Sequence, residues 1–122
     1  MRIVGLGNDI IEISRIEKAL ENLRFKEKVY THKEREIIDK KGNSVQSYAG
    51  RFSAKEAIAK ALGTGVRKFN LTDIEILNDE LGKPFVKFYG ELEKISRGYR
   101  VELSISHCKE YATAVAIIYV EV

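Results

Sequence analysis

The segment 45–62 holds the side chains whose types and spacing say most about chemistry. Its apolar residues recur at helical spacing, which predicts one long helix that stops at Gly63. A carboxylate on the polar side could hold a divalent cation through oxygen, and three nearby cations could neutralise the oxygens of a polyphosphate. Ordinary i, i+4 ion pairs on a solvated helix are the alternative explanation. The polar residues are Arg51, Lys55, Glu56 and Lys60.

A second carboxylate, Asp9, follows the β-branched segment 2–6 and the glycines Gly5 and Gly7. We expect the glycines to let a ligand approach the backbone. Asp9 would then complete an oxygen site with Glu56, because Mg²⁺ is usually held by one or two carboxylates together with water and phosphate oxygens. Alternatively, Asp9 caps the helix that follows it. A dinucleotide-binding fingerprint is disfavoured, because the third glycine is missing and no strand–helix–strand unit follows.

Two further features lie in the second half of the chain. His107 ends a segment in which apolar and polar residues alternate, so it could contact phosphate or exchange a proton near neutral pH. A solvated loop histidine is the simpler alternative. Gly82-Lys83-Pro84 is typical of a turn between two strands. Taken together, Asp9, Glu56, the nearby cations and His107 indicate a Mg²⁺-dependent site for a phosphorylated small molecule.

The order of the predicted elements indicates how these residues are positioned. Helices are expected first and antiparallel strands afterwards, which favours an α+β fold over a doubly wound parallel sheet. Thr31 followed by Glu34 is a capping-box signature that marks one helix start. Periodicity predicts helices at 12–23, 31–40, 45–62 and 91–96, and strands at 2–6, 73–77, 84–88, 100–106 and 112–120.

Length and composition restrict the class of protein. The 122 residues, 44% of them apolar and 32% charged, suit one domain spanning residues 1–122 and argue against a disordered chain. No apolar run is long enough to cross a membrane. Charges at Asp9, Glu12 and Arg15 interrupt any signal-peptide core, so we expect a cytoplasmic protein without a membrane partner. The single cysteine, Cys108, excludes an internal disulfide.

The net charge of +3 is unevenly distributed along the chain. It comes from 21 basic and 18 acidic residues, and the stretch 15–41 holds nine Lys or Arg against six Asp or Glu. This stretch is either a solvated helical surface or a docking surface for an acidic partner. A nucleic-acid partner is disfavoured, because the aromatic residues are not interleaved with a dense basic stripe.

Four stretches, in order and at matching spacing, resemble the small bacterial holo-acyl-carrier-protein synthases, a family of 4′-phosphopantetheinyl transferases. The stretches are Gly7-Asn8-Asp9-Ile10, Arg51-Phe52-Ser53-Ala54-Lys55-Glu56-Ala57 with Lys60-Ala61-Leu62-Gly63-Thr64-Gly65, Gly82-Lys83-Pro84, and Ser104-Ile105-Ser106-His107 with Tyr111-Ala112.

This resemblance implies a Mg²⁺-dependent transferase of fatty-acid biosynthesis. Such an enzyme moves the 4′-phosphopantetheine of coenzyme A to a serine of apo acyl carrier protein and releases adenosine 3′,5′-bisphosphate. The implied fold is that of the 4′-phosphopantetheinyl transferases, with a long central helix packed on a small, mainly antiparallel sheet. The implied assembly is a homotrimer with active sites between neighbouring subunits.

The resemblance also implies roles for single residues. Asp9 and Glu56 would be the magnesium ligands, and either Glu56 or a metal-bound water would accept the serine proton. Arg15 and Arg24 would face the acidic carrier protein. Glu56, Lys60 and His107 would be catalytic, and coenzyme A would be bound by Arg51, Lys55, Lys60, Gly63, Gly82, Lys83, Pro84 and His107.

Two positions depart from the family pattern, and two other functions stay open. Ala59 stands where a serine is common, and Cys108 stands where a threonine is common, so each puts one ligand hydrogen bond in doubt. A non-catalytic module that binds RNA or an acidic protein is one rival. A different Mg²⁺-dependent phosphohydrolase, acting without a carrier protein, is the other.

Overall fold

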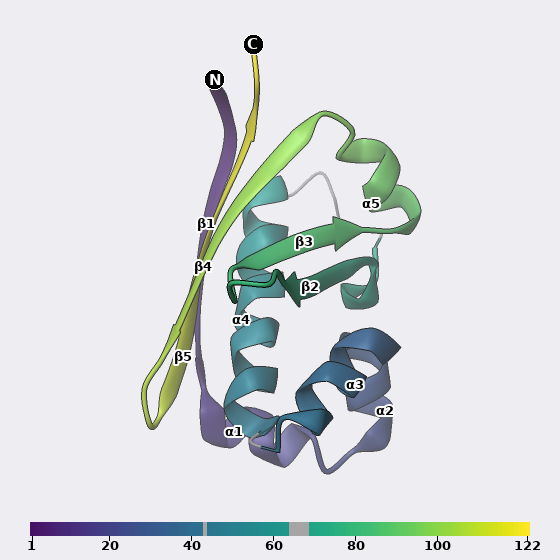
Figure 1. The fold of residues 1–122 in the computed structure, drawn as a ribbon, viewed down its shortest axis with the longest axis vertical. Coiled ribbons are helices and arrows are strands. Elements are labelled where there is room, and N and C mark those ends of the chain that lie inside the picture. Colours follow the sequence, from purple (N-terminus) through teal and green to yellow (C-terminus); the bar gives the residue numbers. More distant parts are fainter. Residues whose placement is uncertain (43, 64–68) are drawn as a thin grey trace.

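Helix α4 lies lengthwise along one face of a three-stranded sheet, and the short helices of residues 13–40 gather around one of its ends (Figure 1). The structure, a computed structural model, describes residues 1–42, 44–63 and 69–122, so Thr64 and Gly65 of the second motif lie outside the described residues. Its elements are β1 (Arg2–Glu12), α1 (Ile13–Ala19), α2 (Leu23–Val29), α3 (His32–Lys40), α4 (Ser44–Leu62), the 3₁₀ turn η1 (Leu71–Asp73), β2 (Ile74–Asn78), β3 (Pro84–Phe88), α5 (Gly90–Ile95), β4 (Tyr99–His107) and β5 (Tyr111–Val120).

Both sheets are antiparallel, which confirms the predicted α+β class. The larger sheet has the order β1-β5-β4, and β2 pairs with β3 in a separate hairpin on the other side of α4 (Figure 1). The central strand β5 turns small, buried side chains toward α4, and this lets the helix lie close to the sheet. These residues are Ala112, Ala114 and Ala116, followed by Ile118.

The first strand is longer than its sequence pattern predicts. Strand β1 continues to Glu12, because every residue from Gly5 to Glu12 pairs with β5. Asp9 therefore lies inside a strand, and the alternative that it caps a helix is wrong, since the N-cap of α1 is Glu12. The helix expected at 12–23 ends early, because α1 stops at Ala19, and a second short helix that was not predicted, α2, occupies Leu23–Val29.

Two predicted helix signals are confirmed, the start of α3 and the end of α4. At the start of α3, the Thr31 hydroxyl accepts a hydrogen bond from the Glu34 amide, and the Glu34 carboxylate accepts one from the Thr31 amide. Helix α4 ends at Gly63, whose φ of +91° is a left-handed conformation that favours glycine. Within the part of the chain that the structure describes, no helix is long and apolar enough to cross a membrane.

Two glycines of β1 let the backbone of α4 touch the strand. A Cβ atom on Gly7 would overlap the carbonyl oxygen of Ala57, and one on Gly5 would overlap the carbonyl oxygen of Ala61. The expectation that these glycines admit a ligand is therefore wrong, because the helix itself occupies that space. Because Gly5 and Gly7 have no side chain, the backbones of α4 and β1 can pack directly against each other.

This close approach predicts that Gly7→Ala destabilises the protein severely. The new methyl group meets backbone atoms that cannot move aside by changing rotamer, so the free energy of unfolding should fall by about 3 kcal/mol. Chemical denaturation measures this loss. The matched control is Gly42→Asn, at a left-handed position with open space around it, where the change should be below about 1 kcal/mol. Equal stability of the Gly7→Ala and wild-type proteins would contradict the close approach.

Candidate active site

Asp9 and Glu56 lie on adjoining elements, β1 and α4, and form a carboxylate cluster with Lys60 and Ser53. The Ser53 hydroxyl donates to Asp9 Oδ2 at 3.1 Å and to the Asp9 carbonyl oxygen at 3.0 Å. Lys60 Nζ donates to Asp9 Oδ1 at 3.3 Å and to the Asn8 carbonyl oxygen at 3.0 Å. The structure thus brings together three of the predicted site residues, Asp9, Glu56 and Lys60.

The electrostatics of this carboxylate cluster fit a bound cation. Burial raises the pKa of Glu56, and the neighbouring Asp9 carboxylate raises this pKa further, while Lys60 opposes the shift. Two neighbouring carboxylates repel each other. A hard divalent cation bound by their oxygens would remove this repulsion. Among the described residues, no group of three or more His, Cys, Asp or Glu side chains could hold a metal, so oxygens of water or of a ligand would complete the coordination.

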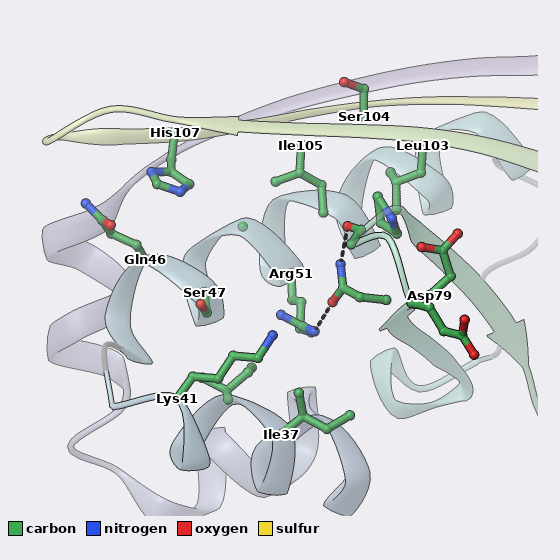
Figure 2. Close-up of a pocket in the computed structure, with 16 residues that line it drawn as sticks. Ile37, Lys41, Gln46, Ser47, Arg51, Asp79, Leu103, Ser104, Ile105 and His107 are labelled. Carbon is green, nitrogen blue, oxygen red and sulfur yellow. Dashed lines mark hydrogen bonds between the residues drawn. The ribbon is translucent and has the colours of Figure 1, made fainter.

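A pocket of about 640 Å³ opens between β4, α3, α4 and the turn that joins β2 to β3. Arg51 lies in it below the strand, and His107 points into it from the end of β4 (Figure 2). Gly82 and Pro84 line the side formed by the turn. The structure therefore gathers a second group of predicted residues, and this group can surround an anion.

Arg51 is held in place by the strand beside it. Only 9% of the residue is exposed; its Nε donates to the Ile76 carbonyl oxygen at 3.1 Å, and its Nη2 donates to Asn78 Oδ1 at 2.9 Å. Burial lowers the pKa of Arg51, and the nearby Glu34 opposes this. Asn78 was missed by the sequence analysis, and no local pattern could have found it, because its partner is 27 residues away.

Helix α4 separates the carboxylate cluster from the pocket within one chain. Arg51 and Glu56 are five residues apart, so they project roughly 140° apart around the helix axis. Asp9 and Ile105 both pair with Ala114, from opposite sides, so two strand spacings, about 10 Å, lie between their backbones. A single subunit therefore does not bring all of the predicted residues into one site.

Lys55 occupies a place that does not fit the expected contact with coenzyme A. Its side chain is 0% exposed, and Nζ donates to Glu34 Oε1 at 2.7 Å, to the Val29 carbonyl oxygen at 2.6 Å and to the Leu71 carbonyl oxygen at 3.0 Å. These bonds use all three ammonium protons. Helical spacing predicts that Lys55 lies on a solvated side of α4. In the structure, α3 and the segment before β2 cover that side, and Lys55 links them to α4 through its hydrogen bonds.

The other predicted site residues belong neither to the carboxylate cluster nor to the pocket. Gly63 ends α4 without lining the pocket, and Lys83 is exposed, with Nζ 3.2 Å from a carboxylate oxygen of Glu102. Arg15 on α1 and Arg24 on α2 are both exposed.

Comparison with known proteins gives one consistent result. The family model of the 4′-phosphopantetheinyl transferase superfamily matches residues 5–116. The chain is 62% identical over 120 residues to a holo-[acyl-carrier-protein] synthase of Fusobacterium nucleatum, a match that covers 95% of this chain and 98% of that protein.

Solved structures of the same family have a similar fold. One is a holo-(acyl-carrier-protein) synthase from Bacillus anthracis in complex with CoA (3′,5′-ADP), with a TM-score of 0.84, 41% identity and coverage of 99% of this chain and 100% of that one. Another is a holo-[acyl-carrier-protein] synthase from Neisseria meningitidis, with a TM-score of 0.88, 34% identity and coverage of 96% of this chain and 98% of that one.

The raised pKa of Glu56 predicts a pH-dependent effect of Glu56→Gln in the metal-free protein. Because folding favours the protonated form of Glu56, ionised Glu56 costs stability, and the wild type regains this stability as the pH falls through the raised pKa. The variant should therefore melt at a higher temperature than the wild type at pH 7, and the difference should shrink as the pH falls towards the ordinary glutamate pKa of about 4.3.

Thermal melts in a chelator at several pH values measure this difference. Glu21→Gln removes the same charge from an exposed position and serves as the matched control. A melting difference that stays constant with pH, or that is equally large in the control, would contradict the raised pKa of Glu56.

Proposed function

This chain belongs to the 4′-phosphopantetheinyl transferase superfamily, and we propose that it works as a holo-acyl-carrier-protein synthase. It transfers the 4′-phosphopantetheine of coenzyme A to a serine of apo acyl carrier protein, as an enzyme of fatty-acid biosynthesis. The observation that carries this proposal is the 62% identity to such a synthase over nearly the whole chain. The paired carboxylates of Asp9 and Glu56 support it from the structure.

Asp9 and Glu56 would hold Mg²⁺, which when bound neutralises the diphosphate of coenzyme A and the charge that builds on the leaving group. Ser53 keeps the Asp9 carboxylate facing α4 through its hydrogen bond. Lys60, whose ammonium group is exposed beside Asp9, adds positive charge for the same phosphates.

The reaction forms one bond and breaks one. The serine oxygen of the carrier bonds to the phosphorus that bears the pantetheine group, and the bond from this phosphorus to the adenosine 3′,5′-bisphosphate oxygen breaks. The serine proton passes to Glu56 or to water.

The separation of the two groups by α4 supports a homotrimer with active sites between subunits. The sheet face opposite α4 exposes apolar side chains in the single chain, where Leu6 is 66%, Ile10 62% and Val115 44% exposed. A neighbouring copy packed there would bury this face. The carboxylate cluster of one subunit would then meet the pocket of the next, where Arg51 and His107 bind the phosphates of the nucleotide portion.

The basic surface on the first helices would recognise the carrier protein. Arg15 and Arg24 are exposed on α1 and α2, within the stretch that holds the whole charge excess. Positive side chains at a rim mainly speed the encounter with an acidic partner. Coenzyme A and carrier proteins are found in the cytoplasm, so we place the protein there.

The direct test is to incubate the protein with coenzyme A, Mg²⁺ and apo acyl carrier protein and then weigh the carrier by mass spectrometry. The carrier should gain one phosphopantetheine, and a chelator should abolish the gain. Glu56→Gln should slow loading by more than about 100-fold, since even the outer partners of metal ligands contribute 10–100-fold. Glu36→Gln, at an exposed position on α3, is the matched control.

Each rival function gives a different result in this assay. Release of phosphate or free phosphopantetheine without a carrier protein would identify a phosphohydrolase. No mass gain together with salt-sensitive RNA binding would identify a binding module. Full activity of Glu56→Gln would remove Glu56 from the metal site.

Sites shared between subunits predict that two inactive variants restore each other. Glu56→Gln damages the carboxylate half of the site, and His107→Ala damages the pocket half at an exposed residue that folding does not need. Trimers that contain both variants should hold sites in which both halves are intact, so co-expression should recover part of the wild-type rate. If native mass spectrometry detects mixed trimers and these stay inactive, each site is complete within one chain.

A further inference from the structure

The outer edge of strand β2 is closed by two side chains. The amide of Ile76 donates to Glu34 Oε2 at 2.7 Å, and the carbonyl oxygen of Ile76 accepts from Arg51 Nε at 3.1 Å. An open strand edge exposes unpaired backbone groups, and these two bonds satisfy those of Ile76. The bond from Arg51 also attaches one end of the guanidinium to β2, next to the pocket.

Asn78 holds the other end of this guanidinium. Its Oδ1 accepts from Arg51 Nη2 at 2.9 Å, while its Nδ2 donates to the Gly82 carbonyl oxygen at 3.0 Å (Figure 2). A side-chain amide can accept and donate at once, and the two partners fix which way it points. Asn78 therefore connects Arg51 to the turn that forms one side of the pocket.

The neutral amide leaves the charge of Arg51 available. Among the described residues, protein atoms accept from two of its five N–H groups, so three remain for a ligand in the pocket. A carboxylate at position 78 would also accept from Nη2, but it would pair with the positive charge and repel an incoming anion. Asn78 aims the guanidinium without neutralising it.

We propose that Asn78 is a positioning residue that orients Arg51 toward an anionic group of the substrate and couples it to the turn at Gly82. The inference rests on the proposed function, which makes this anion a phosphate of the adenosine bisphosphate portion. Asn78 acts through Arg51 and has no step of its own in the reaction.

The turn itself does not need Asn78 to fold. Asp79 Oδ1 accepts from the amides of Leu81 and Lys83, each at 2.9 Å, and the Asp79 backbone bonds to Lys83 and Gly82 at 2.9 and 3.0 Å. The Asn78→Ala protein should therefore keep the turn and the wild-type fold. This makes its effect on ligand binding interpretable.

The test is a double-mutant cycle on the binding of adenosine 3′,5′-bisphosphate, measured by calorimetry. Asn78→Ala should weaken binding about tenfold, the effect of one lost hydrogen bond to a charged group. Asn78→Asp should weaken it more, although it keeps the acceptor. In the Arg51→Met background, Asn78→Ala should have no further effect, because a positioning residue has nothing left to orient.

If the buried Arg51→Met change prevents folding, NMR spectroscopy of Arg51 in the presence and absence of Asn78 provides a second test. The Arg51 Nε–H signal of the isotope-labelled wild type should be sharp and slow to exchange with water, and Asn78→Ala should broaden it or speed its exchange. Leu81→Ala, which shortens a 95% exposed side chain of the same turn, is the matched control and should leave the signal unchanged.

The outcomes separate this inference from the proposed function. A wild type that neither binds the bisphosphate nor loads the carrier overturns both. A wild type that binds, together with an Asn78→Ala protein that binds equally well or leaves the Arg51 signal unchanged, overturns the positioning role alone. An equal loss from Asn78→Ala with and without Arg51 also overturns it, because the effect would then bypass the guanidinium.

Discussion

The contact between the backbones of β1 and α4 is the constraint on which the rest of the structure depends. It exists because Gly5 and Gly7 have no side chain where Ala61 and Ala57 approach. The same contact sets Asp9 two residues further along the strand, beside the turns of α4 that carry Ser53, Glu56 and Lys60. A larger residue at either glycine would move the helix away from the strand and part the two carboxylates.

The packing of α4 on several sides explains the rest of the site. The sheet covers one side of α4, and α3 and β2 cover another. The polar residues of α4 are therefore divided into separate groups. Lys55 of α4 and Glu34 of α3 form a fully buried ion pair. Arg51 donates a hydrogen bond to the backbone of β2 at Ile76. Such buried charges are stable only with every hydrogen bond made, which gives this part of the protein one well-defined arrangement. The cost is that the carboxylate cluster and the pocket face different directions in one chain.

Local signals predicted most of the elements. The capping box at Thr31, the stop at Gly63 and the hairpin around Gly82 all depend on neighbours within a few residues, so they could be read from the chain alone. The end of β1 could not be read in this way. Its continuation to Glu12 depends on pairing with Tyr111, about a hundred residues away.

The amino-acid sequence by itself determined the fold class, the order of the elements and, through family motifs, the chemistry expected of Asp9 and Glu56. Only the tertiary structure decided which charged residues of α4 reach a ligand, because helical spacing defines faces without saying what covers them. It buried Lys55 and left Lys60 exposed beside Asp9. It also joined Arg51 to Asn78 and Gly82, a set that no local pattern links, since hydrogen bonds between distant segments form only when the chain has folded.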